Sequence, residues 1–215
     1  VDLVDDEMGE DYAKLAGLTA EEDLKEPLKE SMKKRLPWLI ILLGLGMIVS
    51  SVVGVFEKVV TQLPIIMCFQ SLILDMAGNV GTQSLAVTIR VLMDESLTGK
   101  QKFELVLKEM HIGLCNGGLL GILSFVLIGL YIFIFKGRTL IFAYAVSGCI
   151  GLSLMVAMLI SSAVGTCIPL FFKKIHIDPA VASGPLITTI NDLVAVISYY
   201  GLSWIFLIEI MHMAG

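Results

Sequence analysis

The chain has 215 residues, of which 56% are hydrophobic and only 16% are charged, and its mean hydropathy is +0.87. These values exclude an ordinary soluble domain, and several apolar runs reach the roughly 20 residues that a membrane-spanning helix needs. The formal net charge of −5 comes from the first 35 residues, where 11 acidic residues stand against 6 basic ones. We therefore expect a membrane protein in a lipid bilayer, with an acidic soluble head and no nucleic-acid partner.

Residues 1–35 form this acidic head and contain no apolar core of their own. They begin without an initiator methionine or a signal peptide, so we expect the chain to be part of a longer protein. Thr19 suits the N-cap of a helix that runs on to Leu36, since acidic residues follow it in the first turn. Two interpretations stay open: a solvated linker, or a connector that passes a signal from a missing soluble domain to the membrane part, residues 36–215.

Five apolar segments bounded by charged residues follow the head. Each is long enough to cross a bilayer as a helix. The sequence therefore predicts an all-α membrane protein with five transmembrane helices, near residues 36–56, 63–88, 112–135, 140–172 and 181–210.

Lysine and arginine residues are unevenly divided between the two sides of these segments. One side holds Lys33, Lys34, Arg35, Arg90, Lys100, Lys102, Lys108, Lys173 and Lys174, and the other holds Lys58, Lys136 and Arg138. Cytoplasmic loops of membrane proteins carry the excess of basic residues, so we expect a cytoplasmic amino end. Five spans then place the carboxyl end outside.

The second segment contains polar and small residues where lipid would disfavour them, in the run from Ile73 to Gln83. Asp75 and Asn79 lie one helical turn apart, and Thr82 and Gln83 fall on adjoining faces, so together they can line a hydrated path. Two glycines among them, Gly78 and Gly81, permit close backbone approach. The alternative is that the same residues only hold neighbouring helices together.

The third segment carries a packing pattern, because Gly113, Gly117 and Gly121 repeat every four residues. Such a stripe lets membrane helices pack closely, either within one chain or across a dimer. We interpret Asn116, which lies beside the stripe, as a packing residue.

The fifth segment holds Asp192 inside a long uncharged run. A carboxylate at that depth is costly unless it meets water, a cation or a partner, which makes Asp192 the first functional candidate. Thr188 and Gly184 share its helical face, and Pro185 is expected to bend the helix and release the carbonyl of Val181 for a cation. The alternative is a kinked helix whose aspartate bonds a neighbouring helix.

Three motifs in the chain resemble the membrane domain of the MgtE family of magnesium channels and transporters. They are KKRLPWLI at residues 33–40, AGNVGTQSLAVTIR at residues 77–90, and DPAVASGPLITTINDL at residues 178–193. The resemblance covers nearly the whole chain, and the second and third motifs are highly specific.

This resemblance implies a five-helix protomer that forms a homodimer, with a magnesium path along the dimer axis. It implies that the transported Mg²⁺ is held chiefly by Asp192, with help from the positions of Gly184, Thr188, Gly78, Asn79 and Thr82. Asp75 and Gln83 are secondary candidates from the pattern alone. The resemblance also implies that residues 1–35 are the end of a CBS region plus a plug helix, and that the amino-terminal and CBS sensor domains of the full-length chain are missing here.

Two other classes of function are weaker interpretations of the same residues. An intramembrane aspartyl protease needs two membrane aspartates, and Asp75 with Asp192 supplies the number, but Asp192 lies in the run TIND instead of a glycine-aspartate loop. A membrane anchor for a signalling domain, without transport, would need no polar residues in its spans. No phosphate-binding loop or nucleophile motif is visible, so we expect a transporter and no enzyme.

Overall fold

The structure is a computed structural model that describes residues 25–94, 97–179 and 184–212, together with Ala13, Ala16 and Leu18. In this part of the chain the regular elements are all helices. The long ones are α2 (Leu28–Val55), α4 (Met67–Asp94), α5 (Gly99–Phe135), α6 (Leu140–Lys174) and α7 (Gly184–Ser203). Short turns α3 (Glu57–Gln62) and η1 (Pro64–Ile66) join α2 to α4, and a π-helical stretch, η3 (Trp204–Ile210), extends α7.

Five spans in the described residues are long and apolar enough to cross a membrane. They cover residues 28–55, 64–92, 99–135, 140–174 and 184–210, which confirms the five segments predicted from the sequence. The third span begins earlier than expected, because Thr98 and Gln101 form a capping box that starts α5 at Gly99. The chain is thus an all-α, multi-pass membrane protein.

The first long helix starts later than the sequence suggested. Pro27 is the N-cap of α2, and the residues from Lys25 to Pro27 are not helical. The single helix expected from Thr19 to Leu36 is therefore not formed, although Thr19 itself lies outside the described residues. From Leu28 the helix continues without a break through the basic cluster and Pro37 into the membrane span. The expected boundary between head and pore at residue 35 therefore falls inside α2.

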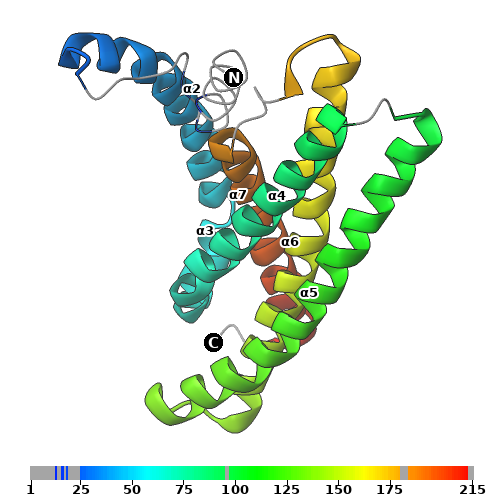
Figure 1. Ribbon diagram of the computed structural model, residues 1–215. Coiled ribbons are helices and arrows are strands. Elements are labelled where there is room, and N and C mark those ends of the chain that lie inside the picture. The colour runs from blue at the N-terminus through cyan, green and yellow to red at the C-terminus, as the bar shows by residue number, and fades with distance from the viewer. Residues whose placement is uncertain are drawn as a thin grey trace.

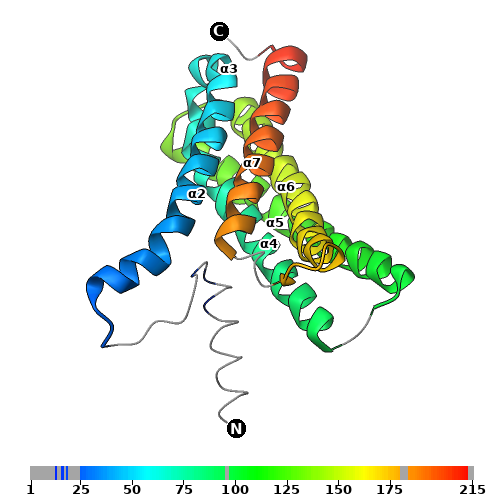
Figure 2. The same cartoon turned by 90° about the horizontal axis from the view of Figure 1, so that it is seen from above.

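The helices are arranged around α6 and α7 (Figure 1). α6 packs against α4, α5 and α7, whereas α7 packs against α2, α4 and α6. Seen from above, α7 lies between α2 and α6 (Figure 2). None of the described residues of α2 is buried. This helix is therefore packed only loosely on the bundle, through its contact with α7.

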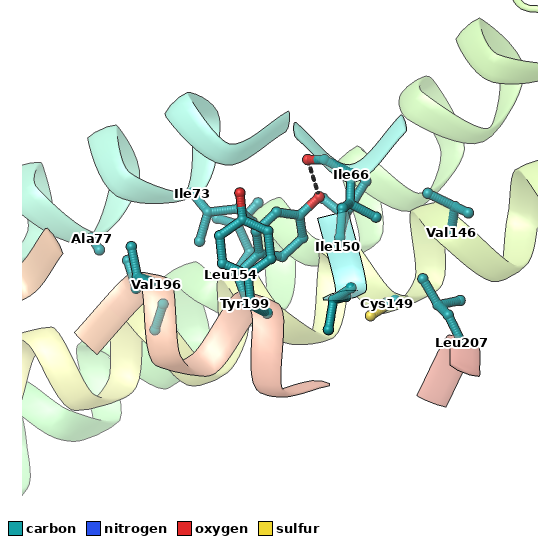
Figure 3. Packing of buried hydrophobic residues seen from close by; sticks show 14 of the residues in the cluster. Ile66, Ile73, Ala77, Val146, Cys149, Ile150, Leu154, Val196, Tyr199 and Leu207 are labelled. Atoms are coloured by element: carbon teal, nitrogen blue, oxygen red, sulfur yellow. Dashed lines mark hydrogen bonds between the residues drawn. The ribbon is translucent and has the colours of Figure 1, made fainter. Parts of the chain in front are cut away.

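The apolar core fills the space where α4, α6 and α7 meet (Figure 3). Tyr199 on α7 is fully buried there, and its hydroxyl donates a hydrogen bond of 2.7 Å to the carbonyl oxygen of Ile66, just before α4. Tyr200 beside it donates to the Gln70 side chain at 2.5 Å. These two bonds satisfy polar groups that lipid could not, and they fix the C-terminal end of α7 to the start of α4.

The glycine stripe of the third segment packs within the chain, against α6. A Cβ atom on Gly121 would lie 2.7 Å from the carbonyl oxygen of Gly151, and one on Gly117 would lie 2.8 Å from the Cα atom of Met155. Both distances are too short for any side chain, so α5 and α6 touch through their backbones.

Candidate functional site

One face of α4 is polar and exposed in the protomer. Ser71, Asp75, Asn79 and Gln83 follow one another at intervals of four residues, and all four are exposed; we call these four residues the α4 polar stripe. Residues at this spacing lie on one side of a helix. Because such side chains are costly in lipid, this side of α4 has to meet water or another protein.

A second face of α4 is in tight contact with α7. A Cβ atom on Gly78 would lie 3.1 Å from the methyl carbon of Thr188, and one on Gly81 would overlap the amide of Asn191. The two glycines are three residues apart, as are Thr188 and Asn191, so matching helix faces meet here. The second and fifth membrane segments, which carry the two sequence motifs, are therefore packed directly against each other.

A third helix also packs at this level. A Cβ atom on Gly165 of α6 would collide with the carbonyl oxygen of Gly81, so the α6 and α4 backbones also touch. Gly81 is thus in contact with both Asn191 of α7 and Gly165 of α6. α4 packs closely on both helices here, because neither contact leaves space for a side chain at Gly81 or Gly165.

Asp192 follows Asn191 on α7 and is half-buried. Thr188 lies one turn before it on the same face, and Gly184, also half-buried, lies one turn earlier at the first described residue of α7. Val181, whose carbonyl was expected to be released by Pro185, lies outside the described residues. The carboxylate is thus carried by the same helix face that contacts Gly78.

Thr82 uses its hydroxyl group within α4. Its Oγ1 donates a hydrogen bond of 2.8 Å to the carbonyl oxygen of Gly78, so two of the predicted ligand positions are bonded to each other. Donation leaves the lone pairs of the hydroxyl oxygen available to accept a hydrogen bond from an ion's water shell.

The side chains of Asn79 and Gln83 lie on a different face of α4 from the one where Gly78 contacts α7. With Asn116 of α5 they line a cavity of about 450 Å³ between α4, α5 and α6, whose other walls are Met76, Val80, Leu119, Leu120 and Met158. Asn79 and Gly78 are consecutive, so their positions differ by about 100° around the helix axis. Asn116, which the sequence suggested as a packing residue, therefore belongs to the polar lining of this cavity.

The structure divides the eight predicted site residues into two groups. One group lies at the contact between α4 and α7: Gly78 and Thr188 touch across it, Thr82 is bonded to Gly78, and Gly184 and Asp192 lie one turn on either side of Thr188. The other group, Asp75, Asn79 and Gln83, belongs to the exposed stripe. In the described part of the chain no group of three or more histidine, cysteine, aspartate or glutamate side chains is placed to hold a metal ion. A cation here would rely on Asp192 together with hydroxyl, carboxamide and main-chain oxygens.

Two buried polar residues were missed by the sequence analysis. Glu109 of α5 is 4% exposed and accepts a hydrogen bond of 2.9 Å from Ser84 of α4, and Asn191 is completely buried. A signal for Glu109 was present, because it lies four residues before Gly113 and so continues the glycine stripe that faces α6. Asn191 could have been recognised by the argument applied to Asp192, since an amide in a membrane span also needs partners.

Comparison with known proteins shows which family the chain resembles. The model of the MgtE family, described as divalent cation transporters, matches residues 70–202. The chain is 38% identical over 207 residues to a magnesium transporter MgtE of Enterococcus faecalis and 35% identical over 207 residues to that of Bacillus subtilis, in each case across 96% of this chain and 44% of the relative. The magnesium transporter MgtE of Thermus thermophilus is 32% identical over 166 residues, across 77% of this chain and 34% of the relative.

The chain spans less than half the length of these curated relatives. The region that matches the family model includes the whole α4 polar stripe, the glycines of α4, the whole of α5 and α6, and Asp192 on α7. With five apolar helices, the matched residues and these relatives, the chain belongs to the MgtE family.

Proposed function

We propose that this protein carries Mg²⁺ across a membrane through a pore on the two-fold axis of a homodimer. The observation that carries the proposal is the α4 polar stripe, which is exposed over about three turns of a membrane-spanning helix. In a bilayer such a surface is stable only beside water or protein. A two-fold axis next to α4 provides both, since two stripes then enclose one hydrated path.

Asp192 is the central charge of this proposed path. Mg²⁺ gives up water reluctantly and is usually bound by one or two carboxylates together with retained waters. Two copies of Asp192, one from each protomer, provide such a pair. The positions of Gly78, Asn79, Thr82, Gly184 and Thr188 supply carbonyl, amide and hydroxyl oxygens to the water shell, and Asp75 and Gln83 extend the polar lining.

Selectivity follows from charge and hydration. A pair of carboxylates attracts a divalent cation about twice as strongly as a monovalent one at the same distance. Calcium has the same charge, so its exclusion must come from the width of the path and from the hydration shell that Mg²⁺ keeps.

The remaining length of the relatives suggests what accompanies this pore. We propose that the chain is the membrane part of a longer protein whose amino-terminal and CBS sensor domains lie outside the present sequence. Residues 1–35 are the connector and plug region and residues 36–215 are the pore domain. The amino end is cytoplasmic and the carboxyl end is outside, as the distribution of basic residues predicts.

Transport of this kind requires no covalent step, and we propose that the chain is not an enzyme. The aspartyl protease alternative needs Asp75 and Asp192 to act as a pair. Asp75 is exposed on the α4 polar stripe, whereas Asp192 is half-buried on the face of α7 that meets Gly78. No observation in the described chain favours that pairing.

Ion flux through the reconstituted protein tests the proposal. We expect Mg²⁺ to enter vesicles faster than Ca²⁺ and much faster than K⁺ under an imposed membrane potential, with protein-free vesicles as the control. Equal flux of Mg²⁺ and K⁺ would contradict a path built on a carboxylate pair. The particle mass in mild detergent is measured on the same protein, and a monomer that conducts Mg²⁺ would contradict the dimeric pore.

A further inference from the structure

Asn191 has surroundings that are unusual for an amide. Its side chain is 0% exposed, and no described residue makes a hydrogen bond with either its Nδ2 or its Oδ1 atom. Burial of an amide without partners costs free energy, and an apolar side chain of the same volume would avoid that cost. We therefore look for the role of Asn191 in the packing of its side chain, since it makes no hydrogen bond with a described residue.

The amide of Asn191 occupies the place where Gly81 lacks a side chain. A Cβ atom built on Gly81 would overlap Nδ2 and would lie 2.9 Å from Cγ of Asn191. The same Cβ would lie 3.2 Å from a methyl carbon of Ile187, one turn earlier on α7. Asn191 therefore inserts into a notch on α4 whose floor is the Gly81 backbone.

The notch also involves α6. The backbone of Gly165 on α6 lies against the Gly81 carbonyl group, since a Cβ atom on Gly165 would collide with that oxygen. A larger residue at position 81 would consequently shift α7 and α4 relative to each other, because the contact between them leaves no space for a side chain there.

Asp192 is the next residue along α7, so any rotation or axial shift of α7 at Asn191 moves its carboxylate. We propose that Asn191 is a positioning residue: its amide, seated in the Gly81 notch, sets the register and rotation of α7 on α4 and thereby places Asp192 in the cation path. The effect on the cation path rests on the proposed function, whereas the register of α7 on α4 can be measured without any transport assay.

A designed disulfide reports the register directly. A Cβ atom on Gly78 would lie 3.9 Å from the Cβ atom of Thr188, within the range of about 3.5–4.5 Å that disulfides need. The variant Gly78→Cys/Thr188→Cys, with the four native cysteines replaced by serine, should cross-link α4 to α7 on mild oxidation. A shift of α7 on α4 by a few ångströms would prevent the bond.

The notch is tested in this background with Gly81→Ala, with Asn191→Ala, and with both together. Gly81→Ala should lower the cross-linking yield, because the new methyl group overlaps the amide. The double variant should restore it, since the methyl group then fills the space that the amide has left. Gly201→Ala is the matched control, because it is a glycine on α7 with no other described atom within 4 Å of its added Cβ.

Transport is measured on the same four variants without the added cysteines. We expect Gly81→Ala to lower Mg²⁺ flux by about tenfold and to raise the half-saturating Mg²⁺ concentration, since a displacement of a site by about 1 Å has effects of this scale or more. The double variant should recover both quantities, and Gly201→Ala should match the unmodified protein. A role in folding alone would change the melting temperature and the yield of folded dimer but leave half-saturation unchanged.

Two results would overturn the proposal. One is normal cross-linking and flux in Gly81→Ala; the other is a double variant no better than Gly81→Ala alone. Asp192→Asn, measured in parallel, separates this inference from the proposed function. If Asp192→Asn abolishes flux while Gly81→Ala is silent, only the positioning role fails, whereas normal flux through Asp192→Asn removes the proposed ion site itself.

Discussion

Asp192 and Asp75 are both aspartates within membrane spans, yet their surroundings differ. Asp192 is half-buried at the packed face of α7, whereas Asp75 is exposed on the α4 polar stripe. Asp192→Asn keeps the shape of the side chain and removes one charge per protomer, so we expect Mg²⁺ flux to fall by about tenfold or more. Asp75→Asn should have a smaller effect. Flux assays on folded, dimeric protein measure both, and near-normal flux through Asp192→Asn would leave Asp75 as the next candidate.

Tyr199 illustrates how a single hydrogen bond contributes to stability in this core. Its buried hydroxyl donates to the carbonyl of Ile66 at 2.7 Å. Tyr199→Phe keeps the ring and removes that bond, so we expect a loss of about 1 kcal/mol in unfolding free energy, seen as a lower melting temperature in detergent. Tyr131→Phe is the control, because that ring is exposed. Equal melting temperatures for all three proteins would show that the bond adds nothing measurable.

At the scale of the elements, the contact between α5 and α6 depends on missing side chains. A Cβ atom on Gly121 would lie 2.7 Å from the Gly151 carbonyl oxygen, whereas one on Gly118, in the same helix, would meet no described atom within 4 Å. Gly121→Ala should therefore destabilise the protein by about 1–3 kcal/mol, and Gly118→Ala should not. Thermal unfolding of the two variants makes the comparison. Similar melting temperatures would mean that the helices separate easily at this crossing.

At the scale of the whole molecule, α5 offers a test of orientation. It has 37 residues and is about 55 Å long, which exceeds the hydrocarbon core of about 30 Å. Lys100 lies in its first turn and Lys136 at its C-cap, and both are exposed. Cysteines at these positions, in protein without its native cysteines, should react with a membrane-impermeant reagent from opposite sides, residue 136 from outside. Labelling of both from one side would contradict the five-span arrangement.

The surface of the protomer agrees with its proposed assembly. α2 has no buried residue in the described chain and carries many exposed apolar side chains, and the α4 polar stripe is exposed as well. Lipid can cover the apolar side chains of α2, but it cannot cover the stripe at low cost. The physical argument for the proposed dimer is therefore strongest at α4, where two protomers can share one hydrated space.

The sequence by itself determined the class of the protein and the number of its spans. Length and hydropathy set these features, because a helix that crosses a bilayer needs a minimum apolar length and satisfies its own backbone. The polar residues of the second segment and Asp192 were equally visible, since their cost in lipid depends on residue type and depth alone. The late start of α2 at Leu28 was missed, because the helix-breaking effect of Pro27 competed with favourable capping around Thr19.

Only the tertiary structure decided how these residues are combined. The family resemblance placed Gly78 and Asn79 in one group, but α7 covers one of them and a cavity beside α5 receives the other. The sequence likewise left open whether the glycine stripe of α5 packs within the chain or across a dimer, and the structure shows it packed against α6. The notch at Gly81 could not be predicted either, because it arises from three helices that are distant in sequence. Periodicity along one helix determines which residues share a face, whereas the partner of that face depends on how the other helices pack.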